Sequence, residues 1–198
     1  MARRRKSNSN DLAVGVIVIL TIVTMLVNFL VSHWYWFFMI IAVVIFVSHN
    51  ARKKKEGLWR EQLRKTQTVQ GILQEFQNNP YAFERYIADI FKSNGFYTKV
   101  TSSTNDGGKD IIMTKDGYRY VVEVKLYSPE HKVGREKIQK LHSAMIDSNA
   151  NYAYFVTTSC FTVPAIEYAS KYGICLVDGN ELAVMVQQLE QKLHDSIK

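Results

Sequence analysis

The sequence predicts an α/β fold, in which a mixed sheet with flanking helices follows a two-helix transmembrane hairpin. A long uncharged apolar segment near the N-terminus predicts the hairpin. Strand-like and helix-like segments that alternate after residue 80, and an Asp-Gly turn between two apolar strands, predict the mixed sheet. The 198 residues leave room for one ordinary domain in addition to the N-terminal segment.

The apolar segment contains no Asp, Glu, Lys or Arg between Asp11 and Arg52. A membrane-spanning helix needs about 20 apolar residues, so residues 12–49 are too long for one span and fit two tight ones. We expect the break near residues 28–33. Basic clusters flank the segment at residues 3–6 and 52–55, and short basic flanks stay in the cytoplasm. We therefore expect a multi-pass protein of the inner (cytoplasmic) membrane, with both ends in the cytoplasm.

Two other interpretations of this segment are a cleaved signal peptide and a single tilted span that leaves the following domain outside. A signal peptide also begins with basic residues and an apolar run. This apolar run is too long for one, no small-residue cleavage site stands out, and a second basic cluster follows. These observations favour the hairpin.

The net charge of +7 does not indicate a DNA-binding face. Residues 1–77 hold 11 basic and 4 acidic residues, whereas residues 78–198 hold 14 of each. The basic excess therefore reflects membrane topology and contact with anionic lipid. A local basic stretch at residues 125–140, with five Lys or Arg and two Glu, is the better candidate for phosphate contact. Cys160 and Cys175 fit small buried apolar residues and form no metal-site pattern.

The segment between the hairpin and the domain has apolar residues at roughly helical spacing. We interpret it as a connector helix that rests on the membrane or on the domain, in preference to a short dimerising helix. The predicted organisation is a basic cytoplasmic N-terminus, a transmembrane hairpin, a basic amphipathic connector and a folded domain, at residues 1–11, 12–49, 50–77 and 78–198.

The folded domain begins with an amphipathic helix that Asn79-Pro80 opens and Gly95 closes. A strand-like stretch and a hairpin follow, and then helices and apolar strands alternate to the end. The predicted elements are a helix at 80–94, strands at 96–102, 106–115 and 118–127, a helix at 135–147, a strand at 152–158, a helix at 163–172, a strand at 174–177 and a last helix after 179.

The turn Asp116-Gly117 sets the register of the central hairpin, because a two-residue Asp-Gly turn pairs the residues on either side of it. Asp110 then lies opposite Glu123, and Lys125 points to the same face of the sheet. Like charges directly opposite destabilise a sheet, so a divalent cation between the carboxylates would reverse the interaction. Mg²⁺ typically takes one or two carboxylates and completes its shell with water and phosphate oxygens.

Two alternatives remain for these charges. Lys125 could simply neutralise Glu123 on a solvated face, although the apolar neighbours make such a face less expected. A register shift of one residue would move one strand's charges to the opposite face of the sheet and separate the carboxylates.

The charged hairpin resembles the PD-(D/E)xK nuclease core, and the wider sequence resembles the Mrr-like restriction endonuclease domain of type IV restriction systems. The resemblance covers about residues 78–186. Its motifs occur in the family's order: Phe83-Glu84, GGKDI with Asp110, the Glu123-Val124-Lys125 tripeptide, Gln139, FVTTS at 155–159, FTVPAIEYA at 161–169 and LVDG at 176–179.

This resemblance, together with the hairpin geometry, implies a metal site in which Asp110, Glu123 and the carbonyl of Val124 hold Mg²⁺. Lys125 would orient or help deprotonate the attacking water, or stabilise charge on the phosphate. Glu84 would reach the metal or its waters, although a glutamate at the edge of an apolar stripe is equally well explained as a solvated flank. Gln139 is a weaker catalytic candidate.

Three hydroxyl residues lie at the end of a predicted strand. Thr157, Thr158 and Ser159 could contact the DNA backbone or cap the end of the strand, and both interpretations stay open.

The implied function is that of a membrane-anchored, Mg²⁺-dependent DNA endonuclease that hydrolyses phosphodiester bonds in restriction or defence against foreign DNA. Many Mrr-like members carry glutamine at the position of Glu123, and the glutamate here favours an intact metal site. In this chain a transmembrane hairpin stands where such enzymes often carry a separate DNA-recognition domain. Methylation-dependent specificity is therefore not implied. The alternatives are a nuclease of branched DNA or repair intermediates and a non-cutting, membrane-tethered DNA-binding protein.

The expected partners are DNA and the lipid bilayer, the latter through residues 12–49. Cutting both strands of a duplex would usually require two active sites. That requirement is compatible with a homodimer, although the sequence shows no interface.

Overall fold

The computed structural model describes residues 9–101 and 109–196. The chain divides into two compact units, Met1–Gly57 and Leu58–Lys198. Helix α1 (Ser9–Lys65) supplies the first unit and the first residues of the second.

In the first unit, α1 exposes every side chain from residue 13 to residue 50. By length and composition α1 could cross a membrane, a test that a signal sequence near the N-terminus would also pass. The helix continues without a break through residues 28–33, so the predicted two-span hairpin is not confirmed.

The stretch NFLVSH contains no glycine or proline that would end a helix. Two of its polar side chains bond to the helix itself. Ser32 Oγ donates to the carbonyl of Phe29 at 3.1 Å, and His33 Nδ1 lies 2.9 Å from the same carbonyl. The polar residues that suggested a turn are therefore compatible with a continuous helix.

The second unit contains a five-stranded mixed sheet in the order β1-β2-β3-β4-β5. The first three strands pair antiparallel and the last three pair parallel. The predicted α/β fold with a mixed sheet and flanking helices is confirmed. The strands are β1 (Tyr97–Val100), β2 (Ile111–Lys115), β3 (Tyr118–Lys125), β4 (Tyr152–Thr157) and β5 (Ile174–Val177).

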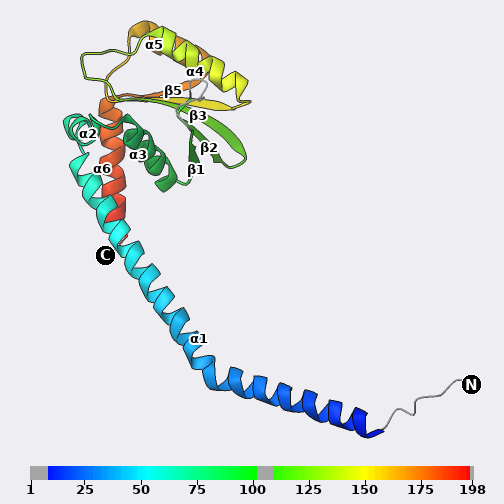
Figure 1. The fold of residues 1–198 in the computed structure, drawn as a ribbon. Helices are drawn as coiled ribbons and strands as arrows, with labels where there is room; N and C mark the ends of the chain where they lie inside the picture. Colours follow the sequence, from blue (N-terminus) through cyan, green and yellow to red (C-terminus); the bar gives the residue numbers. More distant parts are fainter. Residues whose placement is uncertain (1–8, 102–108, 197–198) are drawn as a thin grey trace, which may run out of the picture. The chain divides into compact units, whose positions relative to one another are not determined.

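Helices cover both faces of the sheet (Figure 1). Both parallel crossovers run over the same face, as right-handed connections in one direction require. That face is covered by α4 (Arg135–Asp147) and α5 (Val163–Tyr172). The other face is covered by α2 (Val69–Phe76), α3 (Pro80–Ser93) and α6 (Gly179–Asp195).

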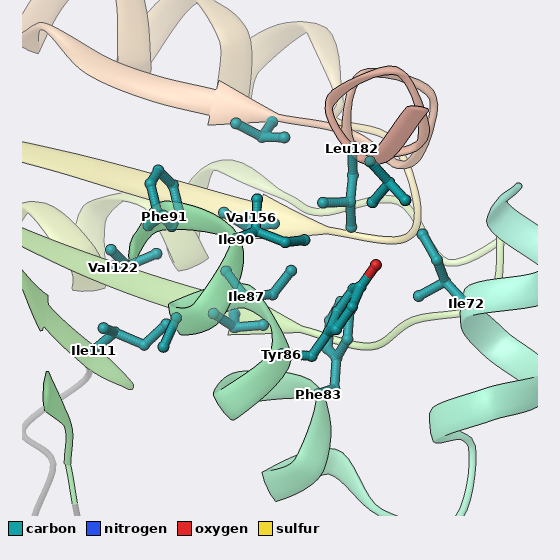
Figure 2. Close-up of a cluster of buried hydrophobic side chains, with 14 of the residues drawn as sticks. Ile72, Phe83, Tyr86, Ile87, Ile90, Phe91, Ile111, Val122, Val156 and Leu182 are labelled. Atoms are coloured by element: carbon teal, nitrogen blue, oxygen red, sulfur yellow. The ribbon is translucent and has the colours of Figure 1, made fainter. Parts of the chain in front are cut away.

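The larger core lies between α3 and the sheet. Figure 2 shows side chains of α3 next to Ile111, Val122 and Val156 of the strands. Asn79 caps α3 by accepting a hydrogen bond from the backbone of Ala82 at 3.0 Å, as the Asn-Pro signal predicts.

The connector also contributes to this core. Leu63, Ile72 and Phe76 are buried there, and the hydroxyls of Thr66 and Tyr86 form a buried hydrogen bond. These contacts favour a connector that rests on the domain over a dimerising helix. The compact unit accordingly begins at Leu58, twenty residues before residue 78, where the sequence predicts the start of the domain.

Candidate active site

The central hairpin has the register that the Asp-Gly turn predicts. Asp116 and Gly117 have φ of 52° and 81°, the left-handed conformation that such a turn requires. Lys115 pairs with Tyr118 and Ile111 pairs with Val122. The backbone N–H of Asp110 donates to the carbonyl of Val122 at 2.8 Å, so Asp110 shares the partner of Ile111 and does not extend the ladder to Glu123. Asp110 nevertheless comes close to Glu123, because both carboxylates contact Lys125 Nζ. Their predicted direct pairing across the ladder is not confirmed.

The C-terminal end of β3 extends beyond Ile111, the first residue of β2. The ladder between β2 and β3 stops at the pair Ile111–Val122, whereas the parallel ladder with β4 continues to Lys125–Thr157. The backbone N–H of Val124 then takes the side chain of Asp110 as its acceptor, at 2.7 Å. This bond holds one oxygen of the buried Asp110 carboxylate against the edge of β3.

Lys125 brings the two carboxylates together. Its Nζ lies 3.2 Å from Asp110 Oδ2 and 2.7 Å from Glu123 Oε1, and it donates to the carbonyl of Val124 at 3.0 Å. The Lys125 side chain is 27% exposed, whereas those of its two acidic partners are nearly buried. Two oxygens from β3 and one from Asp110, which directly precedes β2, therefore surround one cationic atom at the margin of the core.

The surroundings of Glu123 disfavour its charged form. Burial raises the pKa of its carboxyl above the usual value, and the nearby Asp110 raises it further, against the opposing effect of Lys125. Its Oε2 atom is buried and has no hydrogen-bond partner within residues 9–101 and 109–196. A buried carboxylate oxygen without a partner is costly, so this atom is suited to an added ligand.

Burial alone would lower the pKa of Lys125, but Glu123 and Asp110 together raise it above the usual value. Lys125 is therefore an ammonium at neutral pH, a hydrogen-bond donor without a lone pair.

The donor set fits a small divalent cation. Asp110, Glu123 and the carbonyl of Val124 supply three oxygens, and the unpartnered Oε2 atom adds a fourth. The described residues contain no group of three or more His, Cys, Asp or Glu that could hold a metal ion. An ion here would take its remaining ligands from water or a bound phosphate, as Mg²⁺ commonly does.

The hydroxyls that end β4 are turned inward. Thr157 Oγ1 donates to the carbonyl of Lys125 at 2.9 Å, and Thr158 Oγ1 both donates to the carbonyl of Tyr127 and accepts from its N–H. Ser159 Oγ donates to the carbonyls of Pro129 and His131. These contacts favour the strand-capping interpretation over DNA contact, because the hydroxyls already bond to backbone carbonyls at the end of β3 and in the segment that follows it.

The other predicted residues lie on helices. Glu84 is half-buried on α3, and Gln139 is exposed on α4. Their catalytic roles stay predictions. Lys140, which follows Gln139, lies close enough to Glu123 for its charge to lower the pKa of that carboxyl. The sequence placed Lys140 in a basic stretch without relating it to Glu123, because the approach of α4 to β3 depends on packing.

Residues 76–186 match the family model Mrr_cat, described as restriction endonuclease. The chain is 29% identical over 123 residues to the type IV methyl-directed restriction enzyme EcoKMrr of Escherichia coli, an alignment covering 58% of this chain and 40% of that enzyme. It is 32% identical over 88 residues to the uncharacterized protein y4cE of Sinorhizobium fredii, covering 42% of this chain and 22% of that protein. The chain thus spans less than half the length of either relative.

Among solved structures, the DNA modification-dependent restriction endonuclease AspBHI has a similar fold. The TM-score is 0.51 at 18% identity, and the match covers 69% of this chain and 40% of that one. The similarity extends the match from the sequence family to the arrangement of sheet and helices.

Proposed function

The chain belongs to the restriction endonuclease family, whose model covers more than half of it, and we propose that it is a membrane-anchored, Mg²⁺-dependent DNA endonuclease. The family is one of endodeoxyribonucleases, and the proposal assigns that activity to this chain. The observation that carries the proposal is the convergence of Asp110, Glu123 and Lys125 at the end of β3, within the matched residues.

In this proposal Asp110, Glu123 and the carbonyl of Val124 would hold the metal ion. When bound, Mg²⁺ supplies positive charge next to the phosphodiester and makes a water molecule more acidic. Asp110 is kept in position by the N–H of Val124, and Thr157 fixes the backbone of Lys125. Glu123 is thus held within β3, and Asp110, which directly precedes β2, is fastened to β3 by a hydrogen bond.

Lys125 acts in this proposal as a donor and a charge, not as the base that takes a proton from water. Its raised pKa keeps the side chain protonated at neutral pH. A protonated lysine can orient a water molecule through its N–H groups and stabilise negative charge on the phosphate. Glu84 and Gln139 remain candidates for a supporting role near the metal and its waters.

We further propose that residues 12–49 anchor the protein in the inner membrane and that the nuclease domain works in the cytoplasm on foreign DNA. The uncharged apolar stretch and its basic flanks support this placement. Accessibility of the domain to an added protease in intact and in opened spheroplasts tests it. Digestion in intact spheroplasts would place the domain outside.

The test of the activity uses the full chain in detergent micelles with supercoiled plasmid, in Mg²⁺ and in EDTA. We expect nicking or linearisation in Mg²⁺ that is lost in EDTA and in the variants Asp110→Ala and Lys125→Ala. Lys115→Ala is the matched control, since Lys115 is a lysine of the same hairpin next to the turn. This control variant is expected to cut like the wild type.

The same assay separates the alternatives. Preferential cutting of a four-way junction over linear and methylated duplexes would point to branched DNA or repair intermediates as the substrate. A wild type that binds DNA and cuts no substrate offered would leave a membrane-tethered DNA-binding protein.

A further inference from the structure

The ammonium of Lys125 is surrounded by the same oxygens that are proposed to hold the metal ion. Its Nζ contacts Asp110 Oδ2, Glu123 Oε1 and the carbonyl of Val124, at 3.2, 2.7 and 3.0 Å. An ammonium has three N–H donors, and each of these oxygens can accept one of them. The lysine thus completes the cluster as its cation.

We infer that the Lys125 ammonium and a divalent ion compete for one position, so that the lysine must leave it before the ion binds. Mg²⁺ bonds its oxygen ligands at about 2.0–2.1 Å. An ion bonded to oxygens that lie 2.7–3.2 Å from Nζ would sit almost in contact with a like charge. The two cations therefore exclude each other in this arrangement.

The Lys125 side chain can move from the cluster into solvent, whereas the buried carboxylates cannot. Asp110 and Glu123 are 5% and 7% exposed, and Asp110 is tied to the N–H of Val124. The Lys125 side chain is 27% exposed and lies beyond the last pair of the β2–β3 ladder. A flexible lysine stem can turn its charge into water there, while the oxygens keep their places for the ion.

This inference rests on the proposed function for the identity of the ion, and it makes a prediction about binding without DNA. Loss of the lysine charge should tighten metal binding, even though loss of the same residue should abolish cutting. A lysine that only helped to position the ion would have the opposite effect, because its removal would weaken binding.

The test measures the affinity of the full chain in micelles for Mn²⁺, from the signal of the free ion in electron paramagnetic resonance, without DNA. We expect Lys125→Met to lower the Kd by at least about tenfold, since a competing charge is removed. Lys115→Met, the control on the same hairpin, should leave the Kd unchanged. Asp110→Asn combined with Lys125→Met should lose the tight binding, which places the ion at this site.

Lys125→Gln, with a polar uncharged side chain, is the second variant if the methionine variant fails to fold, as judged by circular dichroism. A Kd equal to or weaker than that of the wild type in the folded variant would overturn the inference. That outcome leaves DNA cutting by the wild type unaffected. Conversely, a protein that never cuts DNA can still show the tighter binding, so the two proposals fail separately.

Discussion

Two buried polar clusters lie side by side at the ends of β3 and β4, and they differ in how completely their atoms are satisfied. The hydroxyl cluster, Thr157 to Ser159, is neutral, and each side chain is hydrogen-bonded to the backbone of the last residue of β3 or of the segment that follows it. The charged cluster of Asp110, Glu123 and Lys125 retains two like charges and a buried oxygen without a partner in the described part of the chain.

The difference indicates what each cluster contributes. A fully satisfied neutral cluster stabilises the fold, because each hydroxyl replaces its water partner with a carbonyl. In the charged cluster, burial and the neighbouring Asp110 raise the pKa of Glu123 against the effect of Lys125. Such an arrangement is typical of functional sites rather than of structural ones. The hydroxyl cluster holds the chain so that the charged cluster can keep its geometry.

The largest expected effect is on cutting by a variant of the charged cluster. Asp110→Asn keeps the size of the side chain and removes the charge, so we expect single-turnover cutting of plasmid to fall by about 10²–10³-fold, as for other losses of one electrostatic contact in an active site. Gel assays under enzyme excess measure the rate. Cutting within a few-fold of the wild type would remove Asp110 from the site.

The next largest effect is on stability, from a variant of the hydroxyl cluster. Thr158→Val leaves both the N–H and the carbonyl of Tyr127 without their partner. We expect the free energy of unfolding to fall by about 1–3 kcal/mol, measured by denaturant unfolding of the full chain in micelles.

Thr162→Val is the matched control for this comparison. Thr162 precedes α5, and its side chain makes no capping hydrogen bond there. Its replacement should change stability by less than about 0.5 kcal/mol. Equal losses in the two variants would mean that the hydroxyl cluster has no special structural role.

A smaller change in thermal stability is expected when the charge of Glu123 is removed, measured in EDTA so that no metal ion is bound. Because the folded pKa of Glu123 is raised above its ordinary value of 4.5, the carboxyl's stabilising contribution is present below that value and is lost as pH rises through the folded pKa. Glu123→Gln imitates the protonated form, so it should be more stable than the wild type at pH 7. Thermal unfolding at pH 4 and pH 7 should show that the difference disappears in acid. A variant less stable at pH 7 would contradict the direction of the pKa shift.

The smallest expected change in stability comes from Gln139. Its side chain is exposed on α4, so Gln139→Ala should alter the unfolding free energy by less than about 0.5 kcal/mol. If the family resemblance assigns Gln139 correctly, the cutting rate falls without a change in stability. An unchanged rate excludes Gln139 from the catalytic set.

The sequence by itself determined the elements of the domain and the register of its central hairpin, because both depend on local signals. Asn79-Pro80 opens α3, and Asp116-Gly117 adopts the left-handed conformation of a two-residue turn. Once that turn is formed, the ladder pairs Ile111 with Val122, and the alternation of β3 places Glu123 and Lys125 on one face. These relations span fewer than twenty residues.

Only the tertiary structure decided which hydrogen bonds and charge contacts these side chains make with residues distant in the sequence. The hydrogen bonds of the Thr157 and Thr158 side chains depend on a parallel pairing between strands about 30 residues apart. The approach of Lys140 to Glu123 depends on how α4 crosses the sheet. The contacts of Lys125 depend on where β2 begins. Because no residue of β2 pairs with Val124, its N–H is free to bond the side chain of Asp110 and hold it beside Lys125. Such contacts arise between surfaces brought together by burial of the core, and residue spacing along the chain does not encode them.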